Sequence, residues 1–233
     1  MPTWCRKHQL QNSLIYHVYN RGNNKNFIFN EPGDFRHFKD LLRSYAFDFS
    51  TRIYHWVIMS SHYHLLLEIT DPEKLSKLMA GINLSYTYYH HKKYGSAGFL
   101  WQGRFKTQPV QKEKYLCACG RYIERNPVRA GIVTTPAEYE FSSARFYCLG
   151  ETDGITTESP EFRQFGNDIA ARKQAYVNFL RDFDQEAEKR FTGTGPVGDK
   201  EFTQKLIINN GRFIPRRRGR HSKYFLHKRL CGR

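Results

Sequence analysis

The sequence predicts an α+β fold: a ferredoxin-like or RRM-like split βαβ antiparallel sheet with two helices on one face, an added helix, and a helical and basic C-terminal extension. Two observations predict this class. Segments rich in β-branched and aromatic residues alternate with segments whose apolar residues recur every three or four positions. Their order along residues 1–150 is β-α-β-β-α-β and then a helix.

The first half of this pattern contains three strands and one helix. Residues 12–20 predict a strand that ends at the turn signal 21–23. A helix starts at Glu31-Pro32, because proline suits a first helical turn. Its apolar residues are spaced by three and four: Phe35, Phe38, Leu42 and Tyr45. Only two serines separate the strands predicted at 51–59 and 62–69, which indicates a tight hairpin.

The second half begins with a helix that starts at Asp71-Pro72 and closes at Gly95. A fourth strand fits 105–111, where Pro109 indicates an edge or a bulge. The last helix starts near Lys112, and Pro127 interrupts it. The sheet face opposite the two helices stays open unless this last helix or a ligand covers it.

Charge divides the chain of 233 residues into three parts. Residues 1–150, the body of the chain, carry 20 basic and 11 acidic residues. Residues 151–199, a helical acidic connector, carry 6 and 10. Residues 200–233, a basic tail, carry 11 and 1. A basic body and a strongly basic tail indicate a polyanionic partner, although a merely solubilising surface would also explain the charge of the body. Within the connector we expect a helix over 169–190 whose buried stripe is Ile169, Tyr176, Phe179, Leu180 and Phe183. We also expect a flexible linker at 193–198 and a short helix capped by Asp199.

Several protein classes are excluded. No stretch approaches the roughly 20 apolar residues of a spanning helix, so we expect no membrane partner. The N-terminal residues show no apolar core of a signal peptide. Five cysteines without a CxxC pair indicate reduced thiols and a cytoplasmic protein.

A pair of histidines on the third strand carries the first sign of chemistry. His62 and His64 are two apart, so both side chains lie on the sheet face opposite Tyr63 and Leu65. Two imidazoles side by side form half of a site for a divalent metal, although such a spacing alone is more often structural. His17 of the first strand is a further candidate for that face, as a residue that tunes the site or as a structural histidine.

The last helix carries the second sign. Tyr122 and Asn126 are four apart on one helical face, with Arg125 and Arg129 beside them. A tyrosine beside a carboxamide supplies a nucleophile and an oxygen ligand, and the arginines could hold a phosphate. The alternative is an ordinary amphipathic tyrosine with Asn126 as a helix cap. Tyr115 is the rival nucleophile, but its partner at i+4 is a cysteine.

Two segments indicate nucleic-acid binding. Trp101, Arg104 and Lys106 combine an aromatic ring with cations, as single-strand binding requires; alternatively, Trp101 and its neighbour Phe105 belong to the core. In the tail, Arg218 and Arg220 flank a glycine as in minor-groove-binding arms, although a solvated tail that binds DNA nonspecifically fits equally well.

The combination resembles the HUH single-tyrosine transposases, and within them the REP-associated tyrosine transposases. Five segments carry the resemblance in order: 16–22 (YHVYNRG), 59–66 (MSSHYHLL), 101–106 (WQGRFK), 122–131 (YIERNPVRAG) and 141–143 (FSS). The chain departs from the family in having Ser60-Ser61 where Pro-Asn is usual. Asn126 stands where insertion-sequence relatives commonly carry glutamine.

The resemblance implies a bacterial, nucleoid-associated, cytoplasmic enzyme that cleaves and rejoins single-stranded DNA at hairpin-forming palindromic repeats. His62, His64 and Asn126 would hold Mg²⁺ or Mn²⁺, and Tyr122 would attack phosphorus to form a 5′-phosphotyrosine. Arg21, in the first matched segment, joins the residues expected to contact DNA. A monomer is favoured over a homodimer.

Three other functions are consistent with the same fold. A non-catalytic nucleic-acid-binding regulator of RRM-like fold would bind hairpins without cutting them. A replication or conjugation initiator would share the HUH chemistry but would normally carry further domains. A metal-dependent phosphodiesterase that uses water would still cleave without Tyr122.

Overall fold

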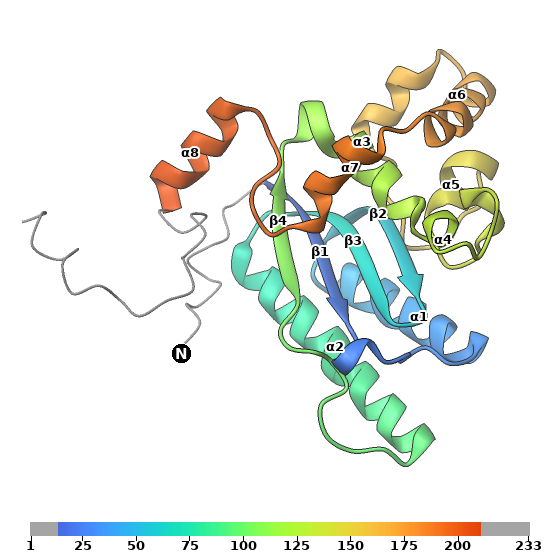
Figure 1. Ribbon diagram of the computed structural model, residues 1–233, viewed down its shortest axis with the longest axis vertical. Helices are drawn as coiled ribbons and strands as arrows, with labels where there is room; N and C mark the ends of the chain where they lie inside the picture. The colour runs from blue at the N-terminus through green and yellow to red at the C-terminus, as the bar shows by residue number, and fades with distance from the viewer. Residues whose placement is uncertain (1–13, 211–233) are drawn as a thin grey trace, which may run out of the picture.

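The computed structural model describes residues 14–210 of the chain, and its centre is one four-stranded antiparallel sheet. The strands are β1 (Leu14–Arg21), β2 (Arg52–Met59), β3 (His62–Ile69) and β4 (Lys106–Val110). Their spatial order is β2-β3-β1-β4, as Figure 1 shows. This order, with helices between β1 and β2 and between β3 and β4, confirms the split βαβ prediction.

Two long helices pack against one face of the sheet. They are α1 (Pro32–Asp48) and α2 (Pro72–Tyr94), which lie side by side behind the strands in Figure 1. The core between helices and sheet includes Phe38, Leu78 and Tyr63, all without exposed surface. Asp71 caps α2 by accepting from the Glu73 amide, and Gly95 ends it with a φ of 60°. The sequence predictions for these elements are therefore confirmed.

A shorter helix covers part of the opposite face. In α3 (Lys112–Glu124), the buried residues Leu116, Cys119 and Ile123 pack in one cluster with Val57 and Leu66 of the sheet. The helix ends at Glu124, earlier than predicted, and α4 (Asn126–Arg129) follows after Arg125. Pro127 lacks the N–H that a continuous helix needs, so the chain restarts there as a new turn. The last helix thus covers part of the face that the sequence alone left open.

The connector wraps around α3. It contains α6 (Ile169–Arg181), α7 (Gln185–Glu188) and the 3-10 turns Pro160–Phe165 and Lys189–Thr192. Helix α5 (Ala144–Leu149) comes just before it, and two further 3-10 turns are Asn23–Lys25 and Pro136–Glu138. Tyr176 and Leu180 of α6 are buried as the apolar spacing predicts, whereas Ile169 and Phe183 are 53% and 40% exposed. Helix α6 ends at Arg181, short of the predicted residue 190, so Phe183 lies beyond it.

The predicted linker is fastened to the sheet. The Val197 amide donates to the Pro109 carbonyl at 2.8 Å, and the Gln111 amide donates to the Val197 carbonyl at 2.8 Å. The Tyr19 hydroxyl donates to the Gly193 carbonyl at 3.0 Å. The prediction of a flexible linker at 193–198 was wrong, because β4 has an unpaired edge that this segment occupies.

Beyond the linker, α8 (Lys200–Asn210) begins where predicted, with the Asp199 carboxylate accepting from the Phe202 amide. Arg218 and Arg220 lie outside the described residues. Within residues 14–210, no helix has the length and apolar character needed to span a bilayer.

Candidate active site

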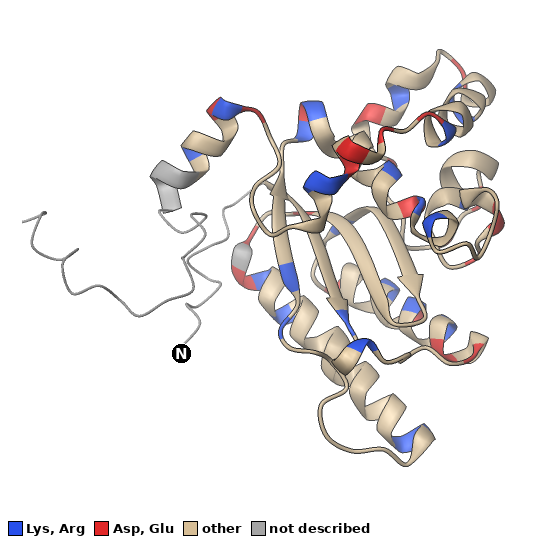
Figure 2. Cartoon of the chain, viewed as in Figure 1, with Lys and Arg blue, Asp and Glu red and all other residues tan. Residues whose placement is uncertain are grey.

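The register of the strands brings the chemistry-bearing residues to one end of the sheet. His62 of β3 pairs with Arg21 of β1, and His64 pairs with Tyr19. Tyr19 also pairs with Lys106, the first residue of β4. Because β3 and β4 both run antiparallel to β1, the end of β1 meets the beginnings of β3 and β4. Figure 2 shows Lys and Arg at this end of the sheet and acidic residues on the connector.

A cleft of about 710 Å³ opens at this end. Its lining residues come from β1, the β2–β3 turn, β3, the segment before β4, α3, α4 and the connector: Tyr19, Asn20, Arg21, Lys25, Ser61, His62, His64, Gln102, Gly103, Arg104, Lys106, Tyr122, Asn126 and Thr192. Seven of the sequence-predicted site residues are among them. We call this space the cleft.

The two histidines line the cleft as neutral imidazoles. Their rings are 5.2 Å apart between centroids and perpendicular. Burial lowers the pKa of both side chains; for His62 a hydrogen bond to Asn126 partly opposes the shift. His62 Nδ1 lies 3.0 Å from the Ser61 hydroxyl, and His64 Nδ1 lies 2.8 Å from Nε2 of His17. Neutral imidazole is the protonation state that binds metal ions.

Asn126 is held with its oxygen available. Its Nδ2 donates to the carbonyls of Tyr122 and Ile123 at 3.1 and 3.0 Å, so both amide hydrogens are used on the last turn of α3. The Oδ1 atom is left for His62. The carboxamide thus caps α3, as the alternative interpretation held, and also faces the histidines.

Two imidazole nitrogens and a carboxamide oxygen at one wall of the cleft fit a divalent cation by their donor chemistry. Among residues 14–210, no group of three or more His, Cys, Asp or Glu side chains is placed to hold a metal ion. The candidate ligands in the cleft contain only two side chains of these types, His62 and His64. The third candidate ligand is the carboxamide of Asn126.

Tyr122 lies against the histidines. Its ring centroid is 5.9 Å from that of His64 and 5.8 Å from that of His17, both edge-on, and 5.4 Å from that of Phe191. The residue is 6% exposed. Burial raises the pKa of the phenol, and the Arg129 guanidinium, centred 4.1 Å from the ring centroid, opposes that rise. Tyr122 is therefore a protonated phenol at neutral pH, with a cation in place to stabilise the phenolate.

The arginines predicted beside Tyr122 have separate surroundings. Arg129 contacts Tyr122 and forms an ion pair with Glu188 of the connector at 3.2 Å. Arg125 is 6% exposed, donates to the Leu180 carbonyl at 2.6 Å and lies 3.3 Å from the centre of the Phe183 ring. Arg125 thus packs into the connector and does not line the cleft, because α3 ends just before it.

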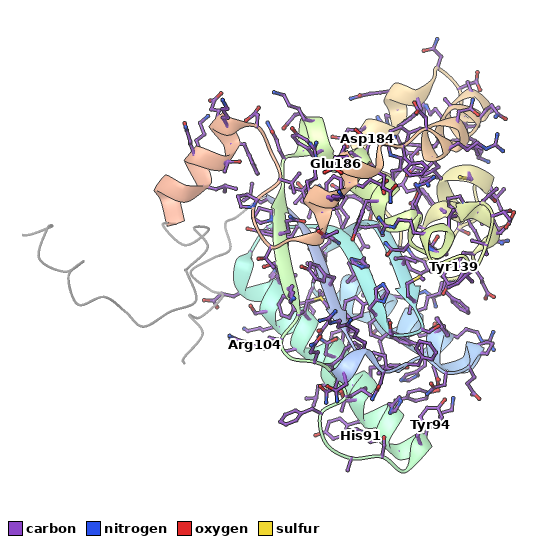
Figure 3. All side chains as sticks on the ribbon, in the orientation of Figure 1. His91, Tyr94, Arg104, Tyr139, Asp184 and Glu186 are labelled. Atoms are coloured by element: carbon purple, nitrogen blue, oxygen red, sulfur yellow. The ribbon has the colours of Figure 1, made fainter. Side chains whose placement is uncertain are left out.

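The residues predicted to bind DNA around the start of β4 also differ in their surroundings. The Trp101 indole N–H donates to the Asn83 carbonyl and the Thr87 hydroxyl, both at 3.1 Å, and its ring packs against Tyr63 in the helix-side core. Trp101 is therefore a packing residue in this structure, as the alternative interpretation held. Arg104, labelled in Figure 3, and Lys106 line the cleft instead.

Sequence reasoning missed several neighbours of the site. Gln108, Thr192 and Glu188 were not singled out, and His17 had no partner assigned. The signal for Gln108 is its register: it pairs with His17 across β1 and β4, and both are polar residues in mid-strand. Thr192 and Glu188 lie on the connector, and no local pattern connects them with the cleft.

Comparison with known proteins agrees with this geometry. A solved structure described as a REP-associated tyrosine transposase bound to a REP hairpin matches with a TM-score of 0.53 and 18% identity, over 68% of this chain and 96% of that one. That match establishes the fold. No curated protein sequence matches. The family model for IS200-like transposases matches residues 10–126, half of the chain, and this span includes the histidine pair, the tyrosine and the asparagine of the cleft. The chain belongs to the IS200-like transposase family.

Proposed function

We propose that this protein is a metal-dependent single-strand DNA endonuclease and strand transferase that forms a 5′-phosphotyrosine intermediate through Tyr122. The observation that carries the proposal is the cleft itself. It brings the Tyr122 phenol, two neutral imidazoles and one carboxamide oxygen together beside Arg21, Arg104 and Lys106. The second phenol of the cleft, that of Tyr19, donates its hydrogen to the Gly193 carbonyl. A phosphodiester bound there would meet a nucleophile, metal-ligating groups and cations at the same time.

His62, His64 and Asn126 would hold Mg²⁺ or Mn²⁺. When bound, the ion polarises the scissile phosphodiester and neutralises charge that develops on its oxygens. The residues of the chain supply the remaining parts. The Tyr122 phenol loses its proton, its oxygen forms a bond to phosphorus, and the bond from phosphorus to the 3′ oxygen breaks. That oxygen takes up a proton and leaves as a 3′-hydroxyl.

Arg129 assists this step from its position over the Tyr122 ring. Its guanidinium contacts the ring and lowers the pKa of the phenol against the effect of burial. The phosphotyrosine keeps the energy of the phosphodiester, so a 3′-hydroxyl can attack it and rejoin the strands.

Two observations support a DNA partner: the cations that line the cleft, and the fold relative, which is described as bound to a REP hairpin. We propose that this chain likewise takes a hairpin-forming palindromic repeat and belongs to the REP-associated branch. Arg21, Arg104 and Lys106 would contact phosphates of the strand that leaves the hairpin foot. The bacterial cytoplasm, at the nucleoid, is where such a substrate is met, and we propose that the protein acts there as a monomer.

A covalent-adduct assay tests the proposal. Wild-type protein, single-stranded hairpin DNA and Mn²⁺ are combined, and a protein–DNA adduct is sought on a denaturing gel. Tyr122→Phe is expected to form no adduct and to release no 3′-hydroxyl product. Tyr115→Phe is the matched control, since Tyr115 lies two turns earlier on α3 and outside the cleft.

The alternatives predict different results. A hydrolase that uses water would cleave in the Tyr122→Phe variant, and a binding module would retain hairpin DNA without an adduct in any variant. Either result would refute the proposed mechanism.

A further inference from the structure

A network of buried hydrogen bonds runs from the connector through Gln108 and His17 to His64. Gln108 of β4 is 1% exposed, and its Nε2 donates to the carbonyls of Arg190 and Gly195 at 2.9 and 2.8 Å. Carbonyl oxygens can only accept, so these two contacts use both amide hydrogens. The orientation of the amide is therefore fixed, and Oε1 faces His17.

His17 is the middle residue of this hydrogen-bond network. It has no exposed surface, and its Nδ1 lies 3.3 Å from Oε1 of Gln108. Because that oxygen accepts, Nδ1 carries a hydrogen. The two hydrogen-bond partners of the ring are an amide and another imidazole, and neither compensates a positive charge, so burial favours the neutral ring. A neutral ring with its hydrogen on Nδ1 presents a lone pair at Nε2.

His64 is the last residue of the network. Its Nδ1 lies 2.8 Å from Nε2 of His17, which accepts, so the hydrogen of His64 is on Nδ1. The opposite ring nitrogen, Nε2, then carries a lone pair, and the ring itself lines the cleft. Metal-ligating histidines in general donate their other N–H to a partner that fixes tautomer and orientation.

We propose that Gln108 and His17 are positioning residues that fix His64 as its Nδ1–H tautomer and thereby prepare Nε2 as the metal-binding atom. The backbone carbonyls of residues 190 and 195 hold the Gln108 end of this network. The segment beyond α7 therefore helps to position the metal-binding histidine. The tautomer follows from the hydrogen bonds together with the burial of His17 between two uncharged partners, whereas its use for a metal rests on the proposed function.

Nuclear magnetic resonance of the metal-free protein tests the tautomer. Long-range ¹H–¹⁵N correlations of protein labelled at histidine are expected to show His17 and His64 each protonated at Nδ1 only. A wild-type spectrum with the hydrogen of His64 on Nε2 would overturn the proposal, whatever any variant does.

Measuring metal affinity tests the role of the hydrogen-bond network. Mn²⁺ is titrated into the protein, and free Mn²⁺ is followed by electron paramagnetic resonance. Gln108→Leu keeps most of the side-chain volume but removes the contact to His17, and we expect Mn²⁺ to bind about 10–100-fold more weakly. The His64 spectrum should then show a mixture of tautomers.

Gln111→Leu is the matched control. Gln111 also joins β4 to the connector, through hydrogen bonds with Asp199 at 2.9 and 3.1 Å, but it contacts no histidine. This variant should bind Mn²⁺ as the wild type does. Equal loss in both variants, or unchanged affinity in Gln108→Leu, would refute the positioning role. Failure of the adduct assay with normal Mn²⁺ binding would refute the proposed function and leave this inference intact.

Discussion

Replacing Gly120 with alanine is expected to destabilise the protein, although alanine is the better helix former. Gly120 lies in α3, two residues before Tyr122. A Cβ atom at this position would be 2.7 Å from three atoms of the His55 ring. That ring is 1% exposed, is held by Glu124 at 2.9 Å and is stacked on Tyr147 at 4.7 Å between centroids. It therefore has no room to move aside.

The expected magnitude follows from two opposing effects. Alanine in place of glycine inside a helix stabilises by about 1 kcal/mol. Overpacking a tight core costs about 1–3 kcal/mol, and contacts of 2.7 Å with three atoms of a fixed ring place this site at about 2–3 kcal/mol. The net loss should be about 1–2 kcal/mol in the free energy of unfolding, which for a protein of this size lowers Tm by about 2–8 °C. Adduct formation should fall as well, since a displaced α3 moves Tyr122 relative to His64.

Thermal unfolding followed by circular dichroism measures this effect. Gly33→Ala is the matched control: it lies in the first turn of α1, and its added Cβ would meet only the ends of the Glu31 and Lys93 side chains, at 3.2 and 3.7 Å. Those ends can shift, so Gly33→Ala should leave Tm unchanged or raise it slightly. A Gly120→Ala protein as stable as the wild type would show that the His55 ring does not wedge α3, and the reasoning would fail.

Three further outcomes are expected. Burial alone would raise the pKa of Asp34, but hydrogen bonds, the strongest from the ammonium at the end of α2, bring it to about 2. The free energy of unfolding that this carboxylate contributes is present above about pH 4 and is lost as the pH falls toward 2, a loss on the order of 1–2 kcal/mol after solvent screening. Urea unfolding of Asp34→Asn should lack this loss. If stability falls with pH in parallel for the variant and the wild type, the assignment is contradicted. Changing Arg104 and Lys106 together to glutamine should lower the salt slope of single-strand binding by about 1.4, as measured by fluorescence anisotropy, if each contacts one phosphate; an unchanged slope would exclude both. Because burial lowers the pKa of His62 and His64, Mn²⁺ affinity should stay constant as the pH falls through 6.5 and decline only below it; a decline centred at 6.5 in calorimetric titrations would show ordinary, exposed imidazoles.

Much of the fold can be predicted from the sequence because its signals are local. The period of two in β3 places Tyr63 in the helix-side core and His62 and His64 on the other face, and the structure has both. The caps of α2 at Asp71 and Gly95 depend on neighbouring backbone groups only. Strand alternation and helix capping act within a few residues, so the residue types are sufficient to indicate them.

Other features depend on contacts between distant parts of the chain. Arg125 is next to Asn126 in sequence, yet it packs on the connector because Leu180 and Phe183 meet it there. The linker is bound because β4 offers it an edge.

The sequence by itself determined the order of the elements, the face of the histidine pair and the residues able to act as nucleophile and ligands. Only the tertiary structure decided how α3 covers the sheet, which cations reach the cleft, and that Gln108 and His17 connect the carbonyls of residues 190 and 195 to His64. The physical reason is range. Periodicity and capping arise from neighbouring residues, whereas burial and hydrogen-bond partners arise from segments that fold together from far apart in the chain.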